Sequence, residues 1–357
     1  MKNRIYVCHT YYHVYVTFLK ELSLPIDERG HATLVLSSMS NDFESFASRA
    51  EESGLFEAVY QYDEKPYTFF GELAKYKKDR GNIVLNMWNR MIFCRKLGAF
   101  QEEYIPVDFK AYKDIYVYCD SDSIGYYLTY RRIKYHALED GLNCLAYYDT
   151  ARYDNRGAFK LKAFLSKKLN LIFIQNGYGK YCIDMEVNSI EAIKCSCPYY
   201  KEVKRSDYVE KLTSEGKKII LKTFIKDYDT LIEQLEKANA TKKARVLLLT
   251  EPLCDLETRA RIFHDIIERY CQDATVVIKQ HPRDLLDYSK EFGEYLRIDK
   301  SVPMEMLNFI PNVYFEKVIS VLTETEAILF AKELLRLGPD FMDEYEDPEV
   351  HRQNEKI

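Results

Sequence analysis

The chain contains 357 residues, a length that suits two domains of ordinary size. Hydrophobic residues make up 47% and charged residues 30%, which excludes a disordered or collagen-like chain. The formal net charge is −5 at pH 7, so we expect no nucleic-acid partner. Nine cysteines without a CxxC pair indicate reduced thiols. The sequence shows no signal peptide and no run of about 18 apolar residues, so we expect a cytoplasmic protein.

Short apolar runs alternate with longer amphipathic stretches, which is the pattern of βα units around a parallel sheet. In the first half, strands are predicted at Arg4–Cys8, Ala32–Ser37, Ala58–Tyr62, Asn82–Leu85, Asp114–Cys119 and Lys134–Leu138, and helices at Tyr12–Leu24, Asp42–Ser53 and Ile124–Arg131. In the second half, strands are predicted at Ala244–Thr250, Ala274–Lys279 and Lys317–Val321, and helices at Glu257–Cys271, Met304–Phe309 and Thr325–Leu337, the last ended by Gly338 and Pro339.

A predicted helix at Tyr228–Ala238 and a polar stretch at Asn239–Lys243 separate the two halves. We therefore predict one domain at residues 1–238 and a second at residues 239–357, which ends in an acidic tail. The expected fold class is α/β, with two Rossmann-like αβα domains facing a central cleft. Ligands of such sheets bind beyond the carboxyl ends of the strands, so the residues just after strands are the functional candidates.

In the second half, a buried-type strand ends in the sequence Lys279-Gln280-His281-Pro282-Arg283. Three potential cations, Lys279, His281 and Arg283, follow one another at alternate positions where a phosphate would bind. Pro282 favours an extended conformation at His281. An isolated His-Pro pair is more often a histidine that caps a turn, so this segment needs support from others.

In the first half, Glu139, Asp140 and Gly141 follow a predicted strand. Adjacent acids repel each other, which raises the pKa of one and suits it to accept a proton. Gly141 would permit a tight turn. The alternative interpretation of this tripeptide is an ordinary surface turn.

Two further segments offer contacts for a nucleotide. Thr323 and Thr325 follow a strand at a predicted helix start, where free amides and the helix dipole favour an anion; a simple helix cap fits equally well. Glu305 stands at another helix start, where it can cap the helix or bind a ribose diol.

Taken in order, these segments resemble the bacterial sialyltransferases of glycosyltransferase family 52. The acidic motif of that family matches Glu139-Asp140-Gly141, its HP motif matches His281-Pro282, and its serine/threonine motif corresponds loosely to residues 323–326. Thr10, in Thr10-Tyr11-Tyr12, also looks like the beginning of that family. One departure is Glu326, an acid where relatives show a hydroxyl, so Thr323 or Thr325 is expected to make the phosphate contact.

The resemblance implies a GT-B glycosyltransferase. CMP-sialic acid would be the donor and a galactose-terminated surface glycan, from lipooligosaccharide or capsule, the acceptor. An inverting displacement would use Asp140 as base, with Asp255 as the rival, and His281 as the partner of the leaving phosphate. Lys279, Pro282, Arg283, Glu305, Thr323 and Thr325 would line the donor side, and Thr10, Glu139 and Gly141 the acceptor side. No metal or other cofactor is expected, because CMP leaves as a single phosphate.

Two other functions compete with this prediction. Asp120-Ser121-Asp122 matches the DxD pattern of metal-dependent transferases that use UDP-sugars, although Ser121 and Ser123 look like helix caps. A non-catalytic nucleotide- or carbohydrate-binding protein of the same fold is the third alternative. The central prediction is that the His281 imidazole and the Asp140 carboxylate face each other across the cleft.

Three other patterns receive only minor roles. Residues 156–171 form a basic amphipathic stretch, which is usually a solvated helix face; the alternative is peripheral contact with the inner face of the membrane. His9 and His13 flank the first turn, where we favour packing or an acceptor-side role over a metal. Cys195 and Cys197 lack the second pair that a zinc site requires. A second copy of the chain, in a homodimer, is a further possible partner.

Overall fold

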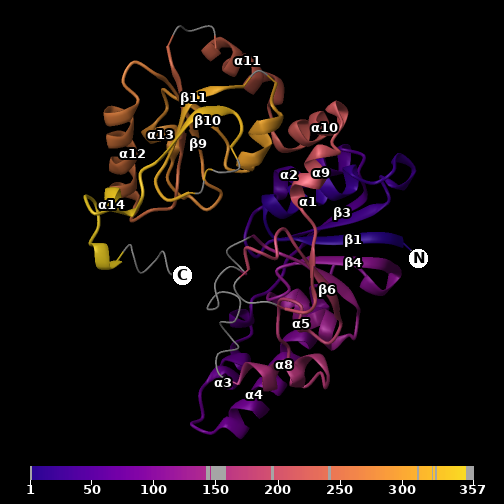
Figure 1. Cartoon of the computed structure of the whole chain (residues 1–357). Helices are drawn as coiled ribbons and strands as arrows, with labels where there is room; N and C mark the ends of the chain where they lie inside the picture. Colours follow the sequence, from indigo (N-terminus) through magenta and orange to yellow (C-terminus); the bar gives the residue numbers. More distant parts are fainter. Residues whose placement is uncertain are drawn as a thin grey trace. The chain divides into compact units, whose positions relative to one another are not determined.

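A computed structural model describes residues 2–141, 145, 158–193, 197–239, 243–311, 313–323, 325 and 328–350. The chain forms two compact units, Met1–Gly216 and Lys217–Ile357 (Figure 1). This division lies earlier than the predicted boundary at residue 238, because the predicted helix at Tyr228–Ala238, observed at Tyr228–Asn239, belongs to the second unit. Each unit holds one parallel sheet, as the predicted α/β class requires.

The first unit contains a seven-stranded sheet with the order β3-β2-β1-β4-β5-β6-β7, and all neighbouring strands are parallel. The order reverses between β1 and β4, which makes the carboxyl ends of these two strands the switch point where ligands bind in such sheets. The strands are β1 (Lys2–Cys8), β2 (Ala32–Ser37), β3 (Phe56–Tyr62), β4 (Tyr112–Tyr118), β5 (Tyr135–Leu138), β6 (Cys182–Val187) and β7 (Tyr200–Glu202).

The helices of this unit are α1 (Tyr11–Leu22), α2 (Glu44–Glu52), α3 (Ala74–Lys77), α4 (Ile83–Phe100), α5 (Ser123–Tyr130), α8 (Phe159–Lys167) and α9 (Arg205–Glu210); α10 (Ser214–Phe224) follows at the division. Helix α5 packs on the sheet face that carries Ile5 and Val7, with its Ile124 and Leu128 fully buried there. Helix α1 covers the opposite face, where its Glu21 accepts a hydrogen bond from the Tyr6 hydroxyl at 2.7 Å.

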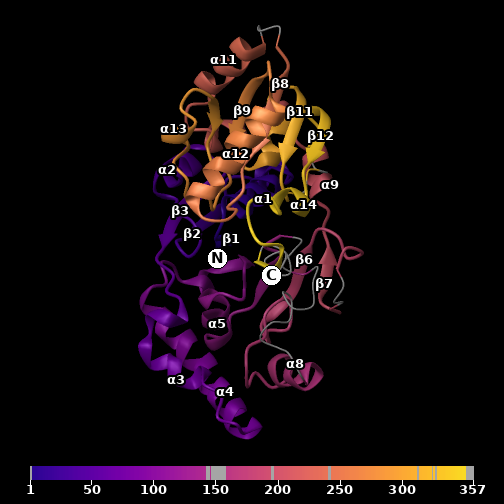
Figure 2. The same cartoon turned by 90° about the vertical axis from the view of Figure 1, so that its left-hand side faces the viewer.

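Helix α4 crosses α5 at a glycine. A Cβ atom at Gly98 would lie 2.6 Å from both the Tyr126 carbonyl oxygen and the Tyr130 Cβ, so any side chain here would force the helices apart. Below this crossing, Phe93 and Leu97 of α4 form a second apolar cluster with Phe173, next to which Phe159 of α8 packs. Helices α3, α4 and α8 therefore contribute to one apolar cluster, and they lie at the lower end of the first unit in Figures 1 and 2.

The second unit contains a five-stranded parallel sheet with the order β10-β9-β8-β11-β12. The order reverses between β8 and β11. Apolar residues of α12 and α14 bury the face that carries Val246 and Ile278. The elements are α11 (Tyr228–Asn239), β8 (Arg245–Leu249), α12 (Leu256–Tyr270), β9 (Thr275–Lys279), α13 (Tyr288–Glu291), β10 (Leu296–Ile298), β11 (Phe315–Ser320), β12 (Ala331–Arg336) and α14 (Pro339–Met342).

Two predicted elements are wrong in type. The predicted strand Asn82–Leu85 is the start of α4, because the Asn82 side chain accepts hydrogen bonds from the Val84 and Leu85 amides and caps the helix. The predicted helix Thr325–Leu337 contains β12 instead, which pairs in parallel with β11. The predicted helix at Met304–Phe309 is a 3₁₀ helix, a tighter helix type. Gly338 (φ +80°) therefore follows a strand, and Pro339 begins α14.

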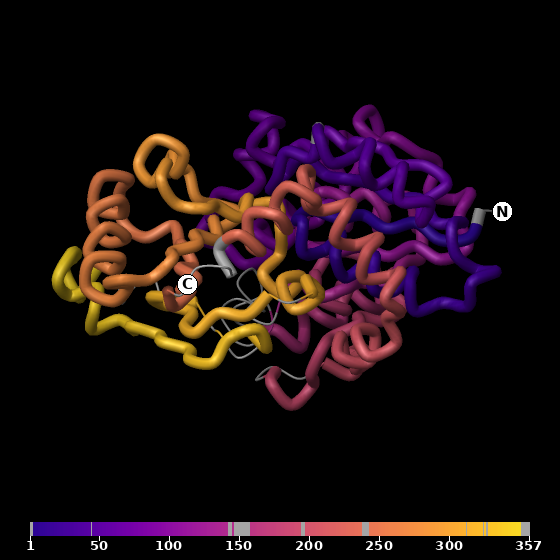
Figure 3. Tube along the Cα trace, turned by 90° about the horizontal axis from the view of Figure 1, so that it is seen from above, coloured from indigo at the N-terminus to yellow at the C-terminus, as the bar shows by residue number. Residues whose placement is uncertain are grey.

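The course of the chain can be followed in Figure 3, where the first unit runs from indigo to rose and the second from orange to yellow. Within the part of the chain that the structure describes, we find no helix with the length and apolar character that crossing a membrane requires.

Candidate active site

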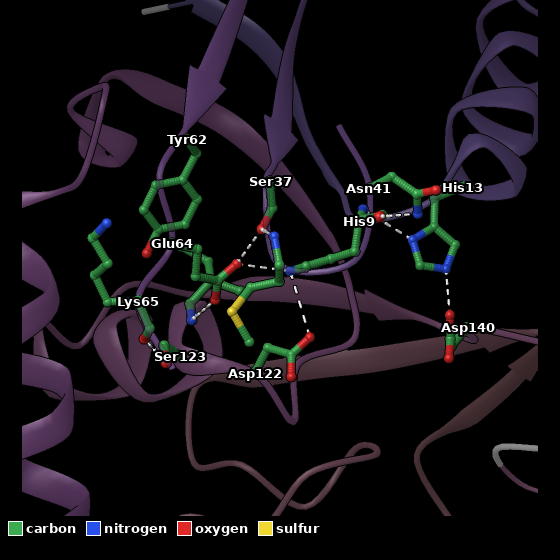
Figure 4. A network of polar contacts seen from close by, with 12 residues as sticks. His9, His13, Ser37, Asn41, Tyr62, Glu64, Lys65, Asp122, Ser123 and Asp140 are labelled. Carbon is green, nitrogen blue, oxygen red and sulfur yellow. Dashed lines mark hydrogen bonds and ion pairs between the residues drawn. The ribbon is translucent and has the colours of Figure 1, made fainter. Parts of the chain in front are cut away.

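The switch point of the first sheet gathers polar residues from five loops (Figure 4). His9 follows β1 and is completely buried. Its Nε2 lies 2.8 Å from Glu64 Oε2, after β3, and 3.7 Å from Asp122 Oδ2, after β4. The Ser37 hydroxyl donates to the same Glu64 oxygen at 2.6 Å. Burial opposes a charge on His9, yet these carboxylates raise its pKa above the ordinary value.

Asp140, after β5, meets His13 in the first turn of α1. The two atoms His13 Nε2 and Asp140 Oδ1 are 2.6 Å apart. His13 Nδ1 accepts a hydrogen bond from the His9 amide at 3.1 Å, so the proton of the neutral ring is on Nε2 and is donated to Asp140. The ring also stacks on Tyr118, with centroids 4.4 Å apart. The His9 amide and the Tyr118 ring therefore hold the His13 imidazole in place, and the imidazole in turn orients the Asp140 carboxylate.

The electrostatics of this pair differ from the prediction. Burial lowers the pKa of His13, which keeps the ring neutral. Although burial alone would raise the pKa of Asp140, the hydrogen bond from His13 lowers it to about 2. Repulsion between Glu139 and Asp140 was expected to raise the pKa of one of them. For Asp140 this prediction is wrong: its pKa is lowered, and Glu139 forms its ion pair with Arg205. Asp140 is 46% exposed at its side chain and is ionised at neutral pH.

The predicted acceptor-side residues have structural contacts. Glu139 is buried, forms an ion pair with Arg205 at 2.8 Å and accepts a hydrogen bond from the Asn188 amide at 2.9 Å. Thr10 caps α1 by accepting from the His13 amide. Gly141 is not among the residues with positive φ, and nothing lies within 4 Å of a Cβ placed there, so its local conformation does not require glycine. A role of these three residues in acceptor binding stays a prediction.

The DxD segment is divided between two environments. Asp120 is buried, and its oxygens accept from the Asn176 amide at 3.0 Å and from the Tyr135 hydroxyl at 3.0 Å. Asp122 faces His9 instead, so the two carboxylates have different partners. Burial raises the pKa of both acids to about 6. The prediction that Ser123 caps the following helix is wrong, because its hydroxyl donates to the Lys65 carbonyl. Asp122 precedes α5, but its side chain makes no capping hydrogen bond.

The same two histidines, together with Cys119, lie close enough to one another that they could hold a metal ion. One ligand atom from each of His9, His13 and Cys119 lies within 4.8 Å of the others. The His9 Nδ1 atom is buried and has no hydrogen-bond partner among the described residues. Of the two cysteines considered above for zinc, Cys195 lies outside the described residues and Cys197 is buried.

In the second unit, His281 follows β9. Its amide donates to the Thr250 hydroxyl at 3.0 Å, and its Nδ1 accepts from the Arg283 amide at 3.1 Å. The neutral ring therefore has its proton on Nε2, which can donate to an anion. Burial, assisted by the positive charges of Arg283 and Lys279, lowers the pKa of His281 to about 4, so the imidazole is neutral at pH 7.

The neighbours of His281 differ in exposure. Pro282 and Arg283 are exposed, whereas Lys279 is buried and donates to the Gln280 carbonyl at 2.5 Å. Burial lowers the pKa of Lys279 to about 8, while Asp299 and Glu305 favour its charged form. Glu305, in the 3₁₀ helix, is thus an electrostatic partner of Lys279, and its proposed contact with a ribose stays a prediction.

Glu251, after β8, occupies the switch point of the second sheet. This buried carboxylate accepts hydrogen bonds from the amides of Val321, Leu322 and Thr323 at 2.9–3.0 Å. The Thr323 amide, predicted to bind phosphate, therefore already donates a hydrogen bond within the protein. Thr325 is buried, and the predicted helix dipole is absent because the described residues that follow lead into β12. Contact of the Thr323 and Thr325 hydroxyls with a phosphate stays a prediction. Glu326 lies outside the described residues.

Asp255, the rival base, caps α12. Its two oxygens accept from the Thr258 amide at 3.0 Å and from the Thr258 hydroxyl at 2.9 Å, and these bonds lower its pKa. Nearby, Arg259 forms a buried ion pair with Asp284 at 2.6 Å. Because the Asp284 amide also donates to the His281 carbonyl, this pair fixes the turn that presents His281.

Four buried polar residues were missed by the sequence analysis: Glu64, Glu251, Arg259 and Asp284. Three of them lie within five residues of a strand end, and Arg259 lies in α12. The available signal was their position: Glu64 and Glu251 both come two residues after a strand, at the edge where ligands bind.

The comparisons with known proteins agree with this architecture. The model of Glycosyltransferase family 52 matches residues 79–323, which is more than half of the chain and includes Asp140, Asp255 and His281. No curated protein matches the chain.

Several solved structures share the fold. A 2,6-sialyltransferase of Vibrionaceae Photobacterium sp. JT-ISH-224, in a ternary complex with CMP and lactose, has a TM-score of 0.53 and 10% identity over 93% of this chain and 70% of that one. An α-2,3-sialyltransferase of Photobacterium phosphoreum has a TM-score of 0.49 and 13% identity over 89% and 84%. The GT-B domain of a Photobacterium damselae sialyltransferase has a TM-score of 0.46 and 11% identity over 90% and 86%.

The strand orders of both sheets and the first of these likenesses confirm the predicted fold class, two parallel-sheet α/β domains of the GT-B type. The chain belongs to glycosyltransferase family 52 and is a glycosyltransferase.

Proposed function

We propose that this enzyme transfers sialic acid from CMP-sialic acid to a galactose-terminated surface glycan, of lipooligosaccharide or capsule, with inversion at the anomeric carbon. The observation that carries the proposal is the family match, which spans both units and contains Asp140 and His281. The crystal structure of the Photobacterium sialyltransferase with CMP and lactose, a galactose-terminated sugar, supports the choice of donor and acceptor.

Asp140 is the proposed general base. It is ionised, partly exposed and oriented by His13. Its low pKa makes it a weak base, which suits a transition state of oxocarbenium character: the phosphate departs early, and the acceptor hydroxyl becomes acidic as it bonds to the anomeric carbon. The proton then passes to Asp140 late in the reaction.

His281 is the proposed partner of the departing phosphate. Its Nε2–H would donate a hydrogen bond to a phosphate oxygen as negative charge develops on CMP, and a preorganised donor stabilises that charge. Arg283 adds positive charge from the same turn. The buried Lys279 adds a second positive charge near His281.

The transfer is proposed to need no metal. CMP leaves as one phosphate, and the Asp120 oxygens already accept hydrogen bonds from Tyr135 and Asn176. The competing function, transfer from a UDP-sugar, would require a different donor and commonly a divalent cation.

Donor hydrolysis tests the proposal. The purified enzyme is incubated with CMP-sialic acid, UDP-glucose or UDP-galactose, with and without lactose, and nucleotide release is measured. Release of CMP that lactose accelerates is expected. Release of UDP alone would favour the second function, and no turnover of any donor would contradict the proposal.

A further inference from the structure

The strongest feature outside the candidate site is an exposed segment at residues 77–88, here called the tip, which joins α3 to the first turns of α4. Every residue from Lys77 to Leu85 is exposed. Four large apolar side chains of the tip face solvent: Ile83 is 74% exposed, Val84 71%, Leu85 53% and Trp88 61%. Such side chains clustered in water commonly mark an interaction surface.

The tip has a defined structure. Asn82 caps α4, and Asp79 accepts hydrogen bonds from the Gly81 amide at 2.8 Å and the Asn86 side chain at 2.6 Å. The Arg80 amide donates to Asn86 at 2.8 Å. The apolar side chains are thus held outward by a hydrogen-bonded loop, and Val84, Leu85 and Trp88 lie on one side of the helix at spacings of three and four residues.

The charges around the tip are mainly positive. Lys77, Lys78 and Arg80 precede the apolar turn, and the acid among them, Asp79, is used within the loop. Helix α8 packs in the same apolar cluster as α4 and contains no acid between residues 159 and 168. Its Lys160 and Lys168 are exposed and Lys162 is half-buried, whereas Lys167 donates to three backbone carbonyls within the unit. Its Leu161 and Phe164 are 55% and 52% exposed. A groove of about 570 Å³, lined by Ile83 and Met87 of α4 and by Lys162 of α8, joins the two helices.

A tryptophan and aliphatic side chains next to lysines and an arginine match the chemistry of an anionic lipid surface, in which the rings and chains enter the interface and the cations contact phosphates. The whole protein has a net charge of −5, so this local positive charge is a property of the face and not of the composition. We infer that the tip, together with α8, docks the enzyme on an anionic membrane.

Trp88 provides the experiment with a natural probe, because it is the single tryptophan of the chain. The full-length enzyme is mixed with vesicles of phosphatidylcholine alone or with 30% phosphatidylglycerol, and both Trp88 emission and cosedimentation are recorded. We expect a blue shift and binding about tenfold or more tighter on the anionic vesicles, with binding weakened at high salt.

Two variants and two matched controls define the surface. Val84→Asp/Leu85→Asp and Lys77→Glu/Lys78→Glu/Arg80→Glu are each expected to weaken vesicle binding about tenfold or more. The controls change similar side chains outside the tip and α8: Leu285→Asp in the second unit, which is 80% exposed, and Lys211→Glu/Lys218→Glu/Lys222→Glu, of which Lys211 belongs to the first unit and the other two to the second. Controls are expected to bind within about twofold of wild type.

The proposal is overturned if anionic vesicles leave Trp88 emission and sedimentation unchanged, or if the controls weaken binding as much as the tip variants. It is also overturned if lipid-free enzyme self-associates through the tip and Val84→Asp/Leu85→Asp abolishes that association, because a second copy would then be the occupant. No tip residue has a role in the proposed reaction, so nucleotide release from a soluble donor should be the same in all variants. This separates failure of docking from failure of the proposed function.

Discussion

The Asp140 carboxylate shows how one hydrogen bond determines the chemistry of a residue. His13 donates to it from a ring whose other nitrogen is occupied by the His9 amide. The same carboxylate without this donor would have a pKa raised by burial, as the neighbouring Asp122 has. At the residue scale, therefore, the roles of acids that look alike in the sequence are separated by their partners.

Asp140→Asn tests the base. Asparagine has nearly the same shape but cannot accept the proton, so we expect turnover to fall about 10²-fold or more with little change in KM for the donor. Asp255→Asn is the matched control, because Asp255 caps a helix. Near-normal turnover in Asp140→Asn together with a large loss in Asp255→Asn would assign the base to Asp255.

His13→Gln tests the positioning of that base through its pH profile. The Asp140 pKa of about 2 places the acidic limb of kcat/KM below the range in which enzymes are usually assayed. Without the imidazole donor, the pKa is expected to rise, so the limb should move upward and activity should fall measurably as the pH decreases towards 4. A profile identical to wild type would show that His13 has only a packing role.

His281 is expected to act as a neutral donor. Its pKa of about 4 means that activity should stay nearly constant as the pH rises through 6.5, where an ordinary histidine would lose its charge. His281→Ala should lower turnover about 10²-fold or more. A decline of wild-type kcat/KM centred near pH 6.5 that is absent in His281→Ala would indicate an imidazolium acid instead.

At the scale of elements, a buried carboxyl group in each unit links the segments at the carboxyl ends of several strands. Glu64 accepts from the Ile124 amide at the start of α5 as well as from Ser37, and Glu251 connects the loop after β8 with the amides that follow β11. In each unit a buried carboxyl group thus accepts hydrogen bonds from backbone amides near the edge where ligands of such folds bind.

Glu251→Gln should reduce stability. The amide group keeps one acceptor oxygen but places an N–H₂ donor against backbone N–H groups, so we expect a loss of about 1–3 kcal/mol in the free energy of unfolding. Urea denaturation followed by circular dichroism measures this loss. Glu257→Gln, an exposed change in α12, is the control and should lie within about 0.5 kcal/mol of wild type.

The sequence predicted most central strands of both sheets because these are fully buried and therefore apolar throughout. Strands β6, β7, β10 and β12 were missed or given the wrong type; β12, for example, is largely exposed at the sheet edge and shows no apolar run. The apolar run at Ile83–Leu85 suggested a buried strand, but the Asn82 cap makes it an exposed helix start. In the candidate site, Asp140 and His281 were proposed from local motifs, whereas the contacts of Glu64 and His13 join residues distant in sequence.

At the scale of the whole molecule, partly or fully buried groups with shifted pKa values respond to acid in opposite directions. His281 has a pKa below its unfolded value of about 6.5, so the stability it contributes is complete above pH 6.5 and is lost as the pH falls towards 4. Asp120 and Asp122 have raised pKa values of about 6, so their contribution in the first unit becomes more favourable as the pH falls from 6 towards 3.8.

His281→Gln should therefore make the protein less sensitive to acid. The difference in unfolding free energy between pH 7 and pH 4.5 is expected to shrink by about 1–2 kcal/mol, a value reduced for the partial exposure of the ring. Urea midpoints at the two pH values measure it. An unchanged difference would mean that His281 titrates normally in the folded state.

Chelation tests the metal-free reaction. Dialysis against EDTA should leave the transfer rate within about twofold of the untreated enzyme, because no step of the proposed reaction uses a cation. Loss of activity that Zn²⁺ restores, and that His9→Ala prevents from being restored, would assign a metal to His9, His13 and Cys119.

The glycine crossing of α4 and α5 has a consequence for sequence variation. Because the carbonyl of Tyr126 occupies the space in which a Cβ would stand, replacing Gly98 even by alanine requires the two helices to separate. Homologous enzymes that keep these helices at the same separation are therefore expected to keep glycine at this position, while the neighbouring exposed positions diverge. An alignment could use this residue as an anchor for placing α4 where overall identity is low.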